Sequence, residues 1–134
     1  MAKSVHSIGW EEIRVSSDIE PELSENARVV LERRYLAKDE EGRLVETPAG
    51  MFTRIARYIA SGDLLYGKTL DEANATADRF YEMMARMEFI PNSPTLMNAG
   101  RPLGQLSACF VLPVEDSMDG IFDSIKHMAL IHKS

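Results

Sequence analysis

The sequence contains one cysteine, no long apolar run and no surplus of basic residues, and each absence excludes a class of protein. One cysteine cannot form an internal disulfide, which favours a protein of a reducing cytoplasm. No stretch approaches the roughly 18 apolar residues that span a bilayer, and residues 1–8 (MAKSVHSI) lack the apolar core of a signal peptide. We therefore expect a soluble cytoplasmic protein with no membrane partner.

Acidic residues outnumber basic residues by 21 to 15, which leaves a formal net charge of -6. Nucleic-acid binding depends on neutralising phosphates with Lys and Arg, so this balance argues against a nucleic-acid partner. A small anionic ligand is still compatible with it, because a helix N-terminus or one arginine can hold a phosphate. With 134 residues, 45% of them hydrophobic, the chain has the size and composition of one soluble domain.

The pattern divides the chain into an irregular lead-in over residues 1–22, an all-helical domain over residues 23–90 and a further segment over residues 91–134. Trp10 is a candidate anchor of the lead-in on the body. Ser24 is a good N-cap for a first helix of about three turns. The polar stretch KDEEGR that follows this helix forms either a turn or a small hairpin.

Two further helices have clear start signals. Thr47 followed by Pro48 predicts a helix that ends with Gly62 as its C-cap. Thr69 and Glu72 have the spacing of a capping box and open the longest helix. The apolar stripes of these two helices are predicted to be buried, with no ligand role for the methionines; they comprise Met51, Phe52, Ile55, Ala56 and Ile59, and then Ala73, Ala77, Phe80, Met84 and Met87.

Residues 62–69 (GDLLYGKT) match the P-loop pattern G-x-x-x-x-G-K-[ST]. A phosphate-binding loop must run from a buried strand into a helix. The preceding residues have a helical period, and the interior of the loop is bulky. A turn between two helices explains every residue, so we interpret the match as accidental.

The only cysteine, Cys109, lies in an apolar run that ends at Glu115 and Asp116. This run predicts a buried strand, and the residues after it predict a helix over 117–132. Strand ends and helix N-termini are common places for functional sites. A lone cysteine is nevertheless most often a small core residue, and composition alone does not distinguish the two interpretations.

Other candidate metal ligands have simpler explanations. Asp116, Asp119 and Asp123 cluster near a helix start, where the macrodipole favours carboxylates in any case. The three histidines are His6, His127 and His132, and their spacing is not that of a zinc site. No nucleophile-elbow pattern supports Ser-His-Asp or Cys-His catalysis.

Two blocks resemble the start of the catalytic domain of ribonucleotide reductase, most closely the class II, adenosylcobalamin-dependent enzymes. They are residues 89–100 (FIPNSPTLMNAG) and residues 106–122 (LSACFVLPVEDSMDGIF). Residues 23–36 (LSENARVVLERRYL), continuing to the ETP of 46–48, resemble the N-terminal helical region of the same class. The resemblance implies a mainly α fold, with an N-terminal helical domain over 23–90 and, over 91–134, the first strand and helix of a ten-stranded α/β barrel.

By this resemblance, Cys109 matches the first of two cysteines that reduce the ribonucleotide substrate. Ser93 matches a substrate-contacting hydroxyl, and the backbone at Ala108 and Cys109 matches part of the nucleotide pocket. Asp116, with Ser117 beside it, matches the specificity site for a dNTP effector. The helix over 117–132 matches one that packs against a partner subunit, which implies a homodimer, and the family also uses a thioredoxin-like reductant.

The family's radical cysteine, second reducing cysteine and adenosylcobalamin site match nothing in this chain. We therefore expect a front piece of the enzyme that needs a complementary C-terminal part, with no activity alone. A class I large-subunit fragment is the nearest alternative. A non-enzymatic helical interaction module, with Cys109 in its core, is the rival from another functional class, and a stand-alone P-loop nucleotide binder comes third.

Overall fold

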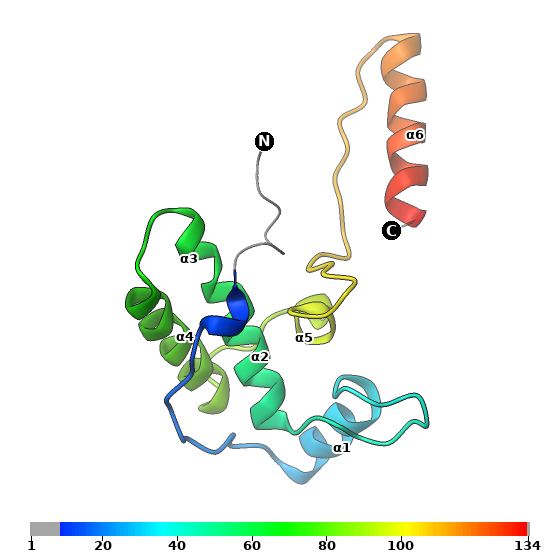
Figure 1. Cartoon of the computed structure of the whole chain (residues 1–134). Coiled ribbons are helices and arrows are strands. Elements are labelled where there is room, and N and C mark those ends of the chain that lie inside the picture. The colour runs from blue at the N-terminus through cyan, green and yellow to red at the C-terminus, as the bar shows by residue number, and fades with distance from the viewer. Residues whose placement is uncertain (1–8, 134) are drawn as a thin grey trace.

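The computed structural model describes residues 9–133; the first eight positions of the predicted lead-in, His6 among them, and Ser134 lie outside this range (Figure 1). The described elements are the 3-10 helix η2 (Trp10–Glu12) and the α-helices α1 (Glu25–Arg34), α2 (Pro48–Ala60), α3 (Gly62–Leu65), α4 (Leu70–Ala85), α5 (Ser93–Asn98) and α6 (Met118–Lys133). The fold is therefore mainly helical, as the sequence predicts. Within this range no helix is both long and apolar enough to cross a membrane.

Helices α2 and α4 pack against each other and form the centre of a helical body (Figure 1). Small residues of both helices are fully buried, which allows the helices to approach closely. Larger apolar residues of other elements complete the core. The core consists of Ile13, Leu36, Met51, Phe52, Ile55, Ala56, Ala60, Ala73, Ala77, Tyr81, Met84, Ala85, Leu96 and Ala99.

Local cap signals are confirmed at each of the three predicted helix starts. The Ser24 hydroxyl accepts the Ala27 N–H at 3.2 Å, and Thr47 caps α2 in the same way. Thr69 and Glu72 form the predicted capping box at the start of α4. The stretch after α1 is a small hairpin, with a single antiparallel bridge between Lys38 and Leu44.

The structure differs from the prediction at the end of α2 and at some positions of the apolar stripes of α2 and α4. Gly62 is not a C-cap: it begins the short helix α3, and Gly67, with φ of 84°, makes the turn before α4. Ile59 and Met87 are exposed, because Ile59 lies at the edge of the α2–α4 contact and Met87 lies beyond the last turn of α4. Phe80 is only half-buried, and its neighbour Tyr81 takes the buried place between Ala77 and Met84.

The lead-in is irregular but is fastened to α4 by polar side chains. Asn74 accepts the Arg14 N–H at 2.8 Å, and Asp78 accepts the Ser16 N–H at 2.5 Å. The Tyr81 hydroxyl donates to the Ile19 carbonyl at 2.8 Å. Trp10 stacks edge-on against Tyr58 and under the Arg57 guanidinium, as an anchor would.

The predicted strand around Cys109 is wrong. Residues 105–117 run as an extended segment away from the helical body, and α6 then runs back beside it (Figure 1). Across residues 9–133 no strand forms, and most of this segment is exposed. An extended chain becomes a strand only when a neighbouring backbone pairs with its N–H and C=O groups, and the described chain offers this segment no such neighbour. The helix after it is present as α6, whereas no barrel is seen within the described residues.

Candidate functional site

The residues matched by the resemblance lie on α5 and on the extended segment that follows it. Asn92 caps α5, with its side-chain oxygen accepting the Thr95 N–H at 3.1 Å. Ser93 is the first residue of α5 and is exposed. Its hydroxyl lies 2.9 Å from the hydroxyl of Tyr35, at the end of α1. The serine that sequence reasoning selected is therefore held by a residue 58 positions earlier.

Three polar side chains of the α5 region hold the start of the extended segment. Asn92 Nδ2 and Thr95 Oγ1 both donate to the Leu106 carbonyl, at 3.2 and 3.4 Å. Asn98 Nδ2 donates to the Gln105 carbonyl at 2.8 Å. We call these three residues the α5 clasp. The clasp joins the helix that carries Ser93 to the backbone just before Cys109.

The other end of α5 is held by Arg54 of α2. Arg54 donates to the carbonyls of Leu96 and Ala99, and its Nε donates to Glu46 Oε1 at 2.7 Å. Glu46 Oε2 also accepts from Arg101 at 3.0 Å. Because the Arg54 and Glu46 side chains are only 13% and 11% exposed, this ion pair is shielded from solvent. It fixes α5 to the helical body.

The burial of Glu46 and its contacts with the two arginines determine its protonation state. Burial by itself raises the pKa of the carboxyl. The Arg54 hydrogen bond, the Ala37 N–H and the charges of Arg54 and Arg101 oppose it and together hold the pKa below its usual value. Glu46 is therefore a carboxylate at neutral pH and keeps both arginines in place.

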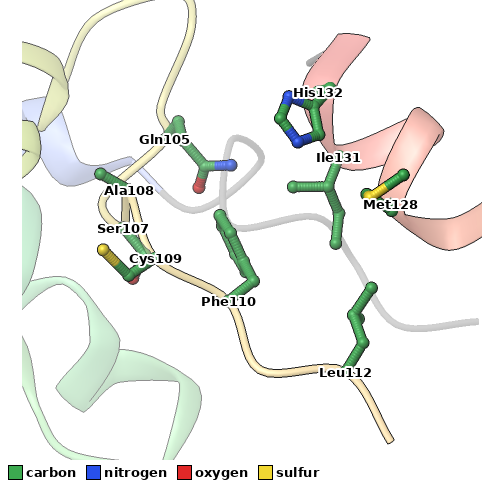
Figure 2. Close-up of a pocket in the computed structure, with 9 residues that line it drawn as sticks. All are labelled: Gln105, Ser107, Ala108, Cys109, Phe110, Leu112, Met128, Ile131 and His132. Carbon is green, nitrogen blue, oxygen red and sulfur yellow. The ribbon is translucent and has the colours of Figure 1, made fainter. Parts of the chain in front are cut away.

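Cys109 lies beside a hollow of about 510 Å³ between the extended segment and α6 (Figure 2). Phe110 and Leu112 of the extended segment face Ile131 of α6 across it, whereas the thiol of Cys109 points away from α6 (Figure 2). The thiol is free and exposed. The interpretation of Cys109 as a core residue is therefore wrong for this chain. The hollow is lined by Gln105, Ser107, Ala108, Cys109, Phe110, Leu112, Met128, Ile131 and His132.

The predicted site residues form two groups rather than one. Ala108 and Cys109 both line the hollow, and Ser93 is linked to them through the α5 clasp although it does not line it. Asp116 and Ser117 lie at the far end of the extended segment, at the start of α6 (Figure 1). The Ser117 hydroxyl accepts the Gly120 N–H at 3.0 Å and caps α6, while Asp116 is exposed beside it.

The P-loop match consists of the short helix α3 and the turn that leads into α4, so only its second half is the predicted turn. Helix α2 precedes it, and the Lys68 ammonium is engaged with Asp63 at 2.9 Å. Asp63 also accepts from the Thr76 hydroxyl, so both groups help close the turn. Within residues 9–133, no three His, Cys, Asp or Glu side chains lie close enough together to hold a metal ion, and this includes the turn and the Asp116 region.

Sequence reasoning missed Tyr35, Glu46, Arg54 and Arg101. Tyr35 and Arg54 contact α5, and Glu46 and Arg101 are bound to these two residues, but the local pattern around each of the four gives no sign of it. Glu46 directly precedes the Thr47–Pro48 helix start and has the appearance of an ordinary exposed acid. The pairing of one acid with two arginines at separations of 8 and 55 residues emerges only from the fold.

The family model described as "Ribonucleotide reductase, all-alpha domain" matches residues 21–104. This match covers more than half of the chain, and it includes the helical body and α5. The chain therefore belongs to the ribonucleotide reductase family.

Curated relatives agree with this assignment. Proteins named vitamin B12-dependent ribonucleoside-diphosphate reductase from Thermoplasma acidophilum and Mycobacterium tuberculosis are 39% and 41% identical to the chain, over 84% and 86% of its length. The ribonucleoside-diphosphate reductase subunit alpha of Helicobacter pylori is 39% identical over 75% of it. The chain spans only 22%, 16% and 12% of these three proteins, respectively.

Proposed function

We propose that this chain is the N-terminal part of an adenosylcobalamin-dependent ribonucleoside-diphosphate reductase, with Cys109 as one of its two reducing thiols. In the proposed reaction, the ribose C2′–OH bond breaks, the hydroxyl leaves as water and hydrogen takes its place. Two thiols supply the two electrons and become a disulfide. A thioredoxin-like dithiol then restores them. The exposed position of the Cys109 thiol is the observation that carries this proposal.

The substrate pocket in this proposal is built from Ser93 and the backbone at Ala108 and Cys109. A reducing thiol must reach the ribose, which requires an accessible sulfur on a fixed backbone. The α5 clasp supports this role because it ties the backbone just before Cys109 to a helix held by buried ion pairs. The second thiol and the radical cysteine belong to the complementary C-terminal part of the enzyme, since the chain has one cysteine.

The effector site in this proposal lies at the start of α6. Asp116 is the group proposed to accept a ribose hydroxyl of a dNTP effector, next to Ser117 at the helix N-terminus. Helix α6 is proposed to be the homodimer surface, because large apolar side chains along it are exposed. They are Met118, Ile121, Phe122, Ile125, Met128 and Leu130.

Adenosylcobalamin does not fit the described residues. The hollow beside Cys109 is bounded by one extended segment and one helix, which do not enclose a corrin macrocycle. Within the described range no cluster of metal-ligating side chains supplements it. The proposal therefore assigns the cofactor to the remainder of the enzyme, and this chain's own residues bind substrate and supply one reducing thiol.

The test is Cys109→Ser in the complete reductase, measured as turnovers per folded molecule with a dithiol donor and a ribonucleoside diphosphate. We expect multiple turnovers to be abolished while the melting temperature stays near that of the wild type, because the thiol is exposed and serine is nearly isosteric. Ser107→Ala, in the wall of the same hollow, is the matched control and should keep its activity. Normal turnover of Cys109→Ser would contradict the reductant assignment.

A class I large subunit is the second candidate. Two relatives favour it: the ribonucleoside-diphosphate reductase subunit alpha of Helicobacter pylori and the ribonucleoside-diphosphate reductase large subunit of Trypanosoma brucei. The same complete enzyme distinguishes the two classes. Turnover that requires added adenosylcobalamin supports class II. Turnover that requires a separate radical-generating subunit instead supports class I.

A further inference from the structure

The hydroxyl groups of Tyr35 and Ser93 are 2.9 Å apart and join the end of α1 to the first residue of α5. Distance alone is compatible with either group as the donor. Each hydroxyl has one proton to donate and two lone pairs to accept. A phenol is a stronger acid than an aliphatic alcohol and is therefore the better donor of the two. This difference gives the pair a preferred direction, from Tyr35 to Ser93.

Tyr35 is held firmly at its own end of this pair. Its backbone N–H donates to the Leu31 carbonyl, and its carbonyl accepts from Arg101 at 3.1 Å. Arg101 is in turn bound by Glu46. The Tyr35 ring is half-buried and packs against the core of the helical body. The phenol therefore stands at a fixed place, whereas the Ser93 side chain is exposed.

We propose that Tyr35 is a positioning residue for Ser93: it donates to the serine oxygen and so presents the proton of Ser93 outward to the substrate. Ser93 then acts toward its ligand as a hydrogen-bond donor. The group that it recognises is an acceptor oxygen of the ribonucleotide. This inference rests on the proposed function, because it needs Ser93 to contact the substrate.

Donation from Tyr35 also strengthens the contact that Ser93 makes. A hydroxyl that accepts one hydrogen bond is polarised and becomes a better donor in the next one. With Tyr35 as phenylalanine, the Ser93 hydroxyl would rotate freely and would have to be ordered by the substrate. The loss should therefore appear in substrate affinity rather than in the chemical step.

The test compares Tyr35→Phe, Ser93→Ala and the double variant in the complete reductase, with cytidine diphosphate as the substrate. We expect each single variant to raise KM about threefold to tenfold, the range of one hydrogen bond, with kcat within about twofold of the wild type. The double variant should show no larger KM than Ser93→Ala alone, since both changes remove one chain of contacts. Tyr66→Phe is the matched control, because Tyr66 is 88% exposed.

The outcomes separate this inference from the proposed function. If Ser93→Ala raises KM and Tyr35→Phe does not, the positioning role is overturned while the substrate contact stands. Fully additive effects in the double variant would also overturn it. If Ser93→Ala leaves KM unchanged, the substrate contact itself is wrong and the inference falls with it. A loss of turnover in Cys109→Ser would then still support the proposed function.

A thermal melt keeps the test independent of folding. Tyr35→Phe retains the ring that packs against the core of the helical body, so its melting temperature should stay near that of the wild type. A raised KM at an unchanged melting temperature supports the positioning role. A KM that rises only together with a fall in melting temperature would overturn it.

Discussion

Glu46 and Arg54 form a shielded ion pair, with Arg54 Nε 2.7 Å from Glu46 Oε1 and a second contact of 3.2 Å between Arg54 Nη2 and Glu46 Oε2. This two-point geometry holds the guanidinium flat against the carboxylate. The remaining donors of Arg54 reach the carbonyls near the end of α5. One pair of side chains thus connects the entry to α2 with the helix that carries Ser93.

Glu46→Gln should lower the free energy of unfolding by about 3 kcal/mol, because it leaves two arginines without their carboxylate in a shielded place. Urea denaturation of this chain measures the change. Glu41→Gln is the matched control: Glu41 pairs with Arg43 but is 64% exposed, so its loss should change stability by less than about 0.5 kcal/mol. Equal effects of the two substitutions would contradict the assignment.

The Glu46 contribution should also depend on pH. Its pKa is lower in the folded chain than in the unfolded chain, so folding favours the ionised form. The stabilisation is fully present above the ordinary glutamate pKa and is lost as pH falls through the folded value. The stability difference between wild type and Glu46→Gln should therefore be constant near neutral pH and shrink in acid. Denaturation series at several pH values check this, and a difference that grew in acid would refute it.

Lys68→Ala should leave nucleotide binding unchanged in this chain and in the complete enzyme. Lys68 pairs with Asp63 to close a turn between helices, and within the described residues no strand leads into that turn. Equilibrium binding of ATP to wild type and variant is the measurement. A loss of ATP affinity in the variant would revive the P-loop interpretation.

Asp116→Ala in the complete enzyme should weaken the effector-driven switch between substrates and spare basal turnover. The residue is exposed at the start of α6, where it can accept a hydrogen bond from a ribose hydroxyl. Turnover of two ribonucleoside diphosphates with and without dNTP effectors measures the switch. Asp123→Ala, on the exposed side of the same helix, is the control. An unaltered effector response in Asp116→Ala would contradict the proposed role of Asp116 in effector binding.

This chain alone should form no deoxyribonucleotide when it is supplied with adenosylcobalamin, a dithiol and a ribonucleoside diphosphate. The proposed reaction needs two reducing thiols, and the chain contains one cysteine. Chromatographic detection of deoxyribonucleotide is the measurement, with the complete enzyme as the positive control. Any turnover by the chain alone would refute the proposed division of roles between the two parts of the enzyme.

Local sequence signals predicted the helix starts correctly because each start depends on residues a few positions apart. Ser24, Thr47 and Thr69 each bond a backbone N–H three residues ahead, so their role needs no tertiary contact. The rejection of the P-loop rested on the same kind of local pattern. The apolar stripes were correct at most positions. They failed at Ile59 and Met87, which are exposed, and in part at Phe80, which is half-buried, because packing rather than periodicity decides burial.

The sequence by itself determined the helices α1, α2, α4 and α6, the capping residues at the starts of the first three and, through two recognisable blocks, the family to which the chain belongs. Its pattern did not predict the short helices α3 and α5. The tertiary structure decided that Cys109 is exposed on an extended segment, that Glu46 joins Arg54 and Arg101, and that Tyr35 meets Ser93. The physical reason is separation along the chain. Helix propensity and capping act within one or two turns, whereas strand pairing, ion-pair burial and contacts between helices depend on residues that come together only after the chain has folded.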